Sequence, residues 1–415
     1  MQRTILHADA NSFYASVECL YRPEIRNFPL SVCGDPEARH GIVLASNQIA
    51  KKRGVKTGMA IWQARQACPD LITVPPDYEL YLHFSCKLRE IYEQYSDRVE
   101  SFGLDECWID VSNPDVTIED GERIAHEIRN RVKMELGITV SVGVATNKIF
   151  AKLGSDMRKP DAVTVIPHSN FQELIWGLPA ADLLYVGPKT TRKLMELCIY
   201  TIGDLARAPS DILKSRLGRN GLLLQAFANG YDSAPVMPTT MESIIKSIGN
   251  STTTPHDIAT LDDARCVYWL LAESVAARLR ENGFRSKCVS ISIRTTDLIT
   301  FSCQQTISTP TNITNEIANL ACELFERRYK RNLPLRSVGI SCSSLSLDTV
   351  PVQLDMLGDQ AHRDKQERLD SAVDDVRKRF GTQIIMRGVV MADSRFAQIN
   401  PKDDHTIHPV PFFSG

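Results

Sequence analysis

The sequence predicts an α+β protein built from several domains. The chain has 415 residues, enough for about three or four domains of ordinary size. Its first part, to about residue 166, alternates strand and helix patterns, whereas residues 167–240 show only short helical patterns joined by glycine turns. A second region of strands and helices follows and ends near residue 348. The sequence thus predicts an α+β domain on each side of a helical one.

The first region follows a split β-α-β order of the ferredoxin-like kind. A buried strand at 3–10 leads into a helix at 11–21, with Asn11 or Ser12 as its N-cap. The sequence then predicts strands at 29–34 and 41–46, a helix from 47 that ends at Gly54, helices at 61–68 and 81–96, a hairpin at 100–111, a helix at 118–137, a strand at 138–145, a helix at 147–157 and a strand at 162–166. Residues 24–75 therefore form a small module inserted after the first helix.

The rest of the chain gives a polar segment and then the second α+β unit. Residues 242–257 are rich in turn formers and predict a linker. The elements expected after it are a helix at 262–283, strands at 288–297 and 300–307, a helix at 314–330, a strand at 335–346 and a helix at 363–381. The Pro- and His-containing end of the chain is expected to be mobile.

Composition restricts the class of protein without revealing a ligand. With 43% hydrophobic and 24% charged residues the chain is typical of globular proteins, and a net charge of −2 means that any nucleic-acid contact depends on local basic patches. Eleven scattered cysteines without a CxxC pair predict reduced thiols. The chain begins without a signal-peptide pattern and has no stretch of about 20 apolar residues. We therefore expect a cytoplasmic protein that does not enter a membrane.

Two adjacent acids interrupt the pattern of a buried strand in ESFGLDECWIDV, residues 100–111. Neighbours on a regular strand point to opposite faces, so Asp105 and Glu106 can share a site only where the pleat is broken. Gly103 supplies such a break and predicts a hairpin with both acids at its end. A solvated turn is the alternative interpretation, because acids are common in turns.

A third acid at the end of the first strand favours a metal site. In a split β-α-β sheet the first strand and the hairpin are neighbours, so Asp9 is expected to meet Asp105 and Glu106. Three such carboxylates suit Mg²⁺, and two Mg²⁺ ions would support phosphoryl transfer. The free amides of residues 11–14 at the following helix start could bind phosphate. Flanking cations that could neutralise a triphosphate are Lys51, Lys52 and Lys159.

Four ordered blocks resemble the Y-family DNA polymerases, the translesion enzymes related to DNA polymerase IV and to UmuC-like members. They are DANSFYASVE, ASNQIAKKRGVKTGM, SFGLDECWID and SVGVATNKIFAKLGSDMRKPDAV. The resemblance covers about residues 1–390 and implies five parts of the chain. These are a palm (1–23 and 76–166), fingers (24–75), a helix-hairpin-helix thumb (167–240), a little finger (241–348) and a C-terminal tail (349–415).

The resemblance also implies roles for individual residues. Asp9 and Asp105, with the carbonyl of Ala10, would bind the metals, and Glu106 would complete the active site. Tyr14 matches the aromatic position that excludes a 2′-hydroxyl. The residues that match positions holding the incoming triphosphate are Phe13, Lys51 and Lys159. Where many members have a Tyr-x-x-Arg pair, this chain has Gln48 and Lys51, which replaces a bidentate donor by a point charge.

Contacts with DNA are expected in two places. In the thumb, Tyr185 replaces the first glycine of the expected phosphate-binding loop, whereas Gly187 is retained beside Lys189. In the little finger, basic residues on or beside strands suit a sheet laid along a DNA backbone, although a solvated face of mixed charge is an equal alternative. These basic residues are Arg285, Lys287, Arg294 and Arg336.

A short peptide after the little finger resembles the clamp-binding motif of bacterial polymerases. Its residues are Gln353, Leu354, Asp355, Met356 and Leu357. The apolar members would fill a pocket on a sliding clamp, as short extended motifs do. The alternative is an apolar segment that packs on the little finger.

The sequence therefore predicts a monomeric, low-fidelity translesion polymerase that adds dNMP to a primer 3′-hydroxyl. Fingers of about fifty residues are small for close inspection of a base pair, and no stretch remains for a proofreading domain. Primer-template DNA and dNTP would be its substrates. Two alternatives are a nucleotidyl cyclase on a similar palm and a non-catalytic DNA-binding scaffold.

Overall fold

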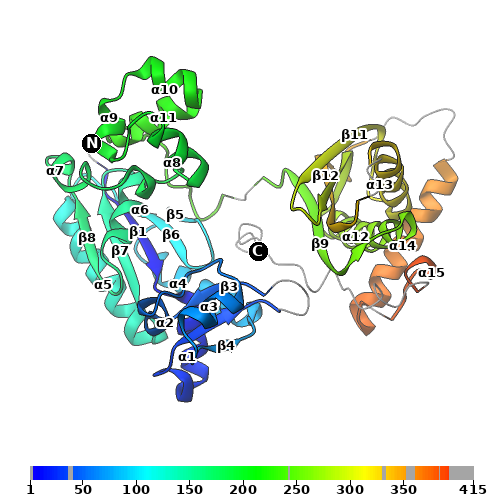
Figure 1. Ribbon diagram of the computed structural model, residues 1–415, viewed down its shortest axis with the longest axis horizontal. Coiled ribbons are helices and arrows are strands. Elements are labelled where there is room, and N and C mark those ends of the chain that lie inside the picture. Colours follow the sequence, from blue (N-terminus) through cyan, green and yellow to red (C-terminus); the bar gives the residue numbers. More distant parts are fainter. Residues whose placement is uncertain are drawn as a thin grey trace. The chain divides into compact units, whose positions relative to one another are not determined.

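Two compact units make up the described part of the chain, one built almost wholly from residues up to 241 and the other from residues after 243. The computed structural model describes residues 3–35, 41–241, 244–329, 333–351, 360–382 and 384–391. Figure 1 labels the helices and strands of both units. All eleven cysteines are free thiols, as the sequence predicted. Among the described residues, no helix has the length and apolar character needed to cross a bilayer.

A five-stranded sheet forms the centre of the first unit. Its order is β5-β6-β1-β7-β8. The strands are β1 (Ile5–Ala10), β5 (Val99–Ser101), β6 (Glu106–Asp110), β7 (Val140–Ala145) and β8 (Val163–Ile166). β1 lies between β6 and β7 and pairs antiparallel with both. The predicted ferredoxin-like neighbourhood of the first strand and the hairpin is therefore present.

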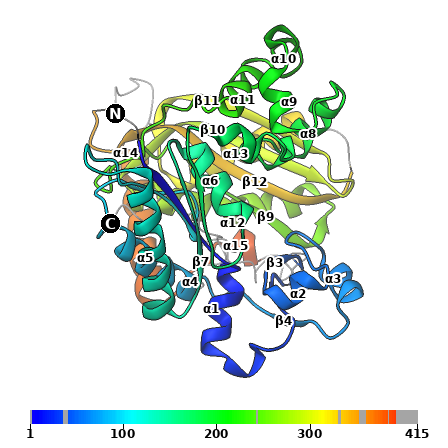
Figure 2. The ribbon, with the colours of Figure 1, turned by 90° about the vertical axis from the view of Figure 1, so that its left-hand side faces the viewer.

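Helices cover both faces of this sheet. One face packs against α1 (Phe13–Tyr21), α4 (Tyr78–Tyr92) and α5 (Ile118–Leu136), and the other packs against α6 (Lys148–Met157). Figure 2 shows the strands between α5 on one side and α6 on the other. Successive side chains of β1 point to opposite faces of the sheet. Leu6 and Ala8 therefore lie in the hydrophobic core shared with α1, α4 and α5, whereas Ile5 lies in the core shared with α6.

The inserted module has its own small sheet, in the order β3-β2-β4. Its elements are η1 (Pro23–Ile25), β2 (Leu30–Cys33), β3 (Val43–Ser46), α2 (Gln48–Lys52), α3 (Ile61–Ala67) and β4 (Ile72–Val74). The sequence analysis missed β4, because three residues before two prolines give too short a pattern to recognise. β4 pairs parallel with β2 and so closes the module onto itself.

Short helices alone form the end of the first unit, as predicted. They are α7 (Phe171–Ile175), η2 (Ala180–Asp182), α8 (Pro188–Met195), α9 (Ile202–Arg207), α10 (Ser210–Leu217) and α11 (Arg219–Ala228). Their buried side chains join those of α6 in one hydrophobic cluster. This cluster attaches the helical region to the sheet.

The second unit is a four-stranded antiparallel sheet with helices on one face. The order is β11-β10-β12-β9, with β9 (Ser247–Ile258), β10 (Phe284–Thr295), β11 (Thr300–Thr311) and β12 (Leu335–Leu347). The helices α12 (Leu261–Glu281) and α13 (Thr314–Arg328) share its hydrophobic core. α14 (Gln360–Phe380) and α15 (Gly388–Met391) contact α12, so this unit extends beyond residue 348.

The prediction of a linker at residues 242–257 was wrong from residue 247 onward. β9 occupies this stretch and pairs antiparallel with β12 from Ser247 to Ile258. Most of its residues are Ser, Thr, Asn or Gly, so it lacks the alternation of apolar residues that marks a strand in sequence. Ladder hydrogen bonds to β12 hold this edge strand in place despite its polarity.

Candidate active site

The register of β1 and β6 brings the predicted acids to one edge of the sheet. Asp9 pairs directly with Glu106, and the amide of Ala10 donates a hydrogen bond of 3.0 Å to the carbonyl oxygen of Asp105. Cross-strand partners have Cβ atoms about 4.5–5.5 Å apart on the same face of a sheet. Backbone pairing therefore places residues 9, 105 and 106 together at the end of β1.

The turn between β5 and β6 places Asp105 beside Glu106 although neighbours on a strand point to opposite faces. Residues 102–105 form this turn, and the amides of Phe102 and Gly103 both donate to the carbonyl of Glu106. A Cβ on Gly103 would lie only 3.3 Å from Oδ1 of Asp105. Asp105 precedes β6, so the alternation of that strand does not fix the direction of its side chain.

A glycine in β7 lets α6 lie directly on the sheet. A Cβ at Gly143 would lie 1.9 Å from the carbonyl oxygen of Ala151, so only glycine allows this close approach. The close packing brings Lys152 of α6 to the acids. Its Nζ lies 2.8 Å from Oε2 of Glu106 and 3.7 Å from Oδ2 of Asp9.

The loop after α6 carries a second lysine into the site. Nζ of Lys159 lies 2.7 Å from Oδ2 of Asp9 and 2.8 Å from Oδ1 of Asp156. The side-chain oxygen of Asn11 accepts a 2.8 Å hydrogen bond from the amide of Asp161. Because Asn11 is buried just beyond β1, this bond ties the loop of Lys159 to the strand that carries Asp9.

The three carboxylates sit in unequal electrostatic environments. Burial raises the pKa of Asp9 to about 7, an effect that Lys159 opposes and Glu106 increases. Burial, followed by the charge of Glu106, raises the pKa of Asp105 to about 6. Burial also disfavours the charged form of Glu106, but His7 and Lys152 outweigh it and lower the pKa of Glu106. Asp9 and Asp105 therefore lack full compensating positive charge.

The donor set at this edge fits a hard cation. Within the described ranges, no three His, Cys, Asp or Glu side chains are arranged as a ready set of metal ligands. Asp9 and Glu106 instead each face a lysine ammonium group. The acids offer only carboxylate oxygens, which are the ligands that Mg²⁺ prefers, and two of them are undercompensated. The residues present thus fit Mg²⁺, with the lysines neutralising part of the same charge.

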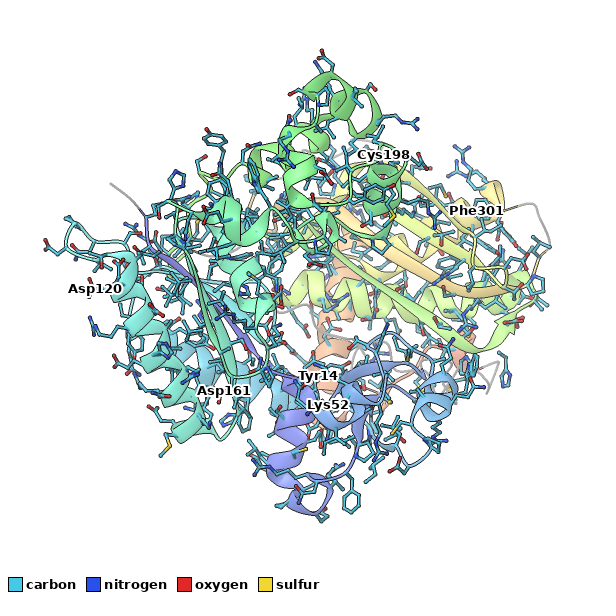
Figure 3. The ribbon with its side chains drawn as sticks, turned by 60° about the vertical axis from the view of Figure 1, so that its left-hand side comes forward. Tyr14, Lys52, Asp120, Asp161, Cys198 and Phe301 are labelled. Atoms are coloured by element: carbon cyan, nitrogen blue, oxygen red, sulfur yellow. The ribbon has the colours of Figure 1, made fainter. Side chains whose placement is uncertain are left out.

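The residues predicted to bind a nucleotide surround the start of α1. Ser12 is the N-cap, one of the two residues predicted, with a φ of 51°, although its side chain makes no capping hydrogen bond. Tyr14 is half-buried, and Figure 3 labels it. Phe13 is buried against it, with ring centroids 5.7 Å apart. Burial, and then the charge of Lys159, lower the pKa of Lys51, so the two predicted lysines lie within electrostatic reach of each other.

The predicted DNA-binding loop of the thumb is exposed at the N-terminus of α8. Gly187 is the N-cap of this helix, and Lys189 lies in its first turn. Tyr185 has a φ of 71° and is 62% exposed, so an aromatic side chain stands in a backbone conformation that usually needs glycine. The loop geometry expected from the sequence is therefore kept without the first glycine.

The four basic residues predicted to contact DNA in the second unit differ in their surroundings. Lys287 and Arg294 are exposed on β10, and Arg336 of β12 is half-buried. Arg285 instead forms an ion pair of 3.0 Å with Glu367 of α14. The predicted clamp-binding residues Gln353, Leu354, Met356 and Leu357 lie outside the described residues.

Sequence reasoning missed two residues that shape the site, Lys152 and Asn11. Lys152 was part of a predicted helix, and its spacing of four residues from Lys148 placed both on one helix face. That spacing does not reveal which face meets the sheet. Asn11 was considered as a helix cap and as one of the free amides that could bind phosphate, but its backbone amide donates to the carbonyl of Thr139 at 2.9 Å and is not free. Its bond to the loop of residue 161 was missed because it joins positions 150 residues apart.

Comparisons with known proteins agree with this geometry. Models of the impB/mucB/samB family and of its C-terminal domain match residues 8–156 and 245–356. The chain is 50% identical over 393 residues to DNA polymerase IV of Acetivibrio thermocellus, covering 95% of this chain and 98% of that protein. It is 36% identical to DNA polymerase IV 1 of Bacillus subtilis, covering 94% and 93%. A solved Y-family DNA polymerase chimera of Dbh and Dpo4 superposes with a TM-score of 0.73 at 26% identity, covering 83% and 99%.

Proposed function

The chain belongs to the impB/mucB/samB family of Y-family DNA polymerases, and we propose that the acids at the end of β1 and β6 form its catalytic centre. Its function is translesion DNA synthesis, with primer-template DNA and deoxynucleoside triphosphates as substrates and a divalent metal as cofactor. This family membership favours polymerase activity over the cyclase and scaffold alternatives. The reaction joins a dNMP to the primer 3′-hydroxyl and releases pyrophosphate.

The acids would hold two Mg²⁺ ions. The residues that would hold them are Asp9, Asp105 and Glu106, with the carbonyl of Ala10 as a further ligand. Bound Mg²⁺ would lower the pKa of the 3′-hydroxyl and neutralise charge on the leaving pyrophosphate. The observation that supports this proposal is the strand register that brings Asp9, Asp105 and Glu106 to one edge of the sheet, where burial raises the pKa of Asp9 to about 7 and that of Asp105 to about 6.

Two lysines and two aromatic residues would orient the nucleotide. Lys159 and Lys51 would bind the triphosphate, and Phe13 would support it. Lys159 contacts Asp9, so nucleotide binding would transfer this ammonium group from a carboxylate to phosphate oxygens. Tyr14 would lie under the sugar and exclude a 2′-hydroxyl.

The remaining parts of the chain would grip DNA and partners. We assign the palm, fingers, thumb and little finger to the ranges expected from the sequence, with α14 and α15 added to the little finger. Gly187 and Lys189 would bind a phosphate, and exposed basic residues of β10 would follow the DNA backbone. The small fingers module supports low fidelity. We further propose a cytoplasmic monomer that binds a sliding clamp through residues 353–357.

Primer extension with Mg²⁺ tests the catalytic centre. The native protein should extend a primer past an abasic site, and the variant Asp105→Ala, Glu106→Ala should lose extension while binding primer-template DNA as before. A matched control is Asp364→Ala, which removes an exposed acid of α14. Normal extension by the double variant would refute the assignment of these acids.

A further inference from the structure

The ring of Tyr14 is supported from one side by a second tyrosine. Tyr81 of α4 stacks on Tyr14 with ring centroids 4.2 Å apart and planes inclined by only 13°. The other rings near Tyr14 are farther away, at 5.7 Å for Phe13 and 6.1 Å for Tyr78, and they are tilted or edge-on. One face of Tyr14 is therefore covered by Tyr81.

Tyr81 is itself fixed by a buried hydrogen bond. Its hydroxyl donates to Oε1 of Glu18 at 2.6 Å, and the two residues are 0% and 2% exposed. Nη1 of Arg22 lies 3.6 Å from the other oxygen of Glu18, so the buried carboxylate also has a cationic partner. A charge-assisted hydrogen bond of this kind holds a ring more firmly than packing alone.

Helix α1 carries both Tyr14, whose ring stacks on Tyr81, and Glu18, which accepts the hydrogen bond of Tyr81. Tyr14 and Glu18 are four residues apart on α1, so both side chains lie on the helix face that meets α4. Tyr81 contacts the first through its ring and the second through its hydroxyl. Movement of the Tyr14 ring toward α4 would therefore require Tyr81 to leave its stacked position and to break its bond with Glu18.

We propose that Tyr81 is a positioning residue for sugar selection, which rests on the role proposed above for Tyr14. Exclusion of a 2′-hydroxyl by an aromatic ring works only if that ring does not move away. Cores are packed densely enough that a fixed neighbour prevents such movement. Tyr81, anchored by Glu18, keeps the ring of Tyr14 against the sugar of the incoming nucleotide. The substrates that it helps to reject are ribonucleoside triphosphates.

The ratio of kcat/KM for CTP to that for dCTP opposite a template guanine tests this role. Tyr81→Leu removes the stacked ring, and we expect the ratio to rise on the order of tenfold, whereas kcat/KM for dCTP changes less. Tyr14→Ala should raise the ratio further. The double variant should match Tyr14→Ala, because a support has no effect once the supported ring is gone.

A control on the same helix separates support from general stability. Phe84 is a buried aromatic residue of α4 that contacts Tyr21 and His83, so Phe84→Leu should leave the ratio unchanged. If Tyr81→Leu does not fold, Tyr81→Met has a similar volume but a more flexible side chain that adapts to the space, and it should still raise the ratio several-fold. An unchanged ratio in the folded Tyr81 variant, with a raised ratio in Tyr14→Ala, would overturn this inference alone. An unchanged ratio in Tyr14→Ala would overturn the proposed role of Tyr14 and this inference with it.

Discussion

Each unit contains a network of charged side chains, and the two networks are balanced differently. The palm network consists of Asp9, Glu106, Lys152, Asp156 and Lys159. The helix-14 network consists of Glu273, Arg280, Asp370, Asp374, Arg377 and Arg387. Both contain closely spaced acids and bases. They differ in how completely each acid is satisfied.

Asp370 shows what a satisfied buried acid looks like. One oxygen accepts from the amide of Thr314 at 2.7 Å and lies 3.3 Å from Arg280, and the other lies 3.2 Å from Arg387. Asp9 instead has a pKa raised to about 7 despite its lysine partner. A buried charge whose hydrogen-bond and ion-pair partners are all supplied by the protein holds one structural element against another. A buried acid that the protein satisfies only in part indicates a ligand site.

The largest effect expected from this difference is on catalysis. Asp9→Asn should lower kcat for nucleotide addition by on the order of 10³-fold, because it removes a carboxylate proposed to hold the catalytic metal. Asp370→Asn, the matched change in the helix-14 network, should leave kcat within about twofold. Single-turnover primer extension measures both. Equal losses in the two variants would contradict the division into a catalytic and a structural network.

The helix-14 network should dominate stability instead. Asp370→Ala leaves two arginines without their shared carboxylate, so we expect the free energy of unfolding to fall by about 3–5 kcal/mol. Urea denaturation of the full chain measures this loss. The control Asp364→Ala removes an exposed acid of the same helix whose side chain accepts a hydrogen bond from Gln360, and it should cost less than about 0.5 kcal/mol.

The pH dependence of stability should distinguish the networks next. The pKa of Asp105 is raised from 3.8 to about 6, so between these values the folded state binds more protons than the unfolded one. In EDTA, the stability of the first unit should therefore fall as pH rises from about 4 to 6, by about 2–3 kcal/mol from this group. Asp105→Asn should remove that part of the decline. Denaturation midpoints at pH 4 and pH 6 measure it, and a steeper decline in the variant would contradict the sign.

Much of the palm could be predicted because its sequence follows local rules. The strand ending at Asp9 and the hairpin around Gly103 are visible from apolar patterns and a glycine, and their pairing follows from the order of elements. Asp9, Asp105 and Glu106 could therefore be placed together. β9 could not be predicted, because a polar edge strand depends on ladder hydrogen bonds to a strand far along the chain, such as the pairing of Ser247 with Ser343.

The roles of individual charged residues were harder to predict, because their ion-pair partners come from distant parts of the chain. Arg285 has the spacing of a DNA-facing residue, yet Glu367 of α14 pairs with it from 82 residues away. Lys152 was not selected because a lysine on a helix is usually solvated, and only Gly143 reveals that this helix lies against the acids. Local patterns give the elements, whereas charge pairing is a property of the assembled fold.

A smaller effect is expected from a change at Asn11, whose hydrogen bond holds the loop of Lys159 beside the palm network. Asn11→Ala should release the loop of Lys159 and raise KM for dNTP by about tenfold, with a smaller change in kcat. Lys159→Ala should raise KM at least as much. The double variant should resemble Lys159→Ala, because both changes remove the same contact. Additive increases in KM would show that Asn11 acts elsewhere.

The smallest effect concerns two basic residues on β10, Arg285 and Lys287, of which Arg285 has an acidic partner within the protein. Lys287 is exposed, whereas Arg285 already pairs with Glu367. If an uncompensated charge marks a ligand site here too, Lys287→Ala should lower the slope of log Kd against log salt for primer-template DNA by about 1. Arg285→Ala should leave that slope unchanged and lower stability slightly, because its partner belongs to the protein. Fluorescence anisotropy over a range of NaCl concentrations measures both slopes, and a reversed order would show that Arg285 exchanges Glu367 for a DNA phosphate.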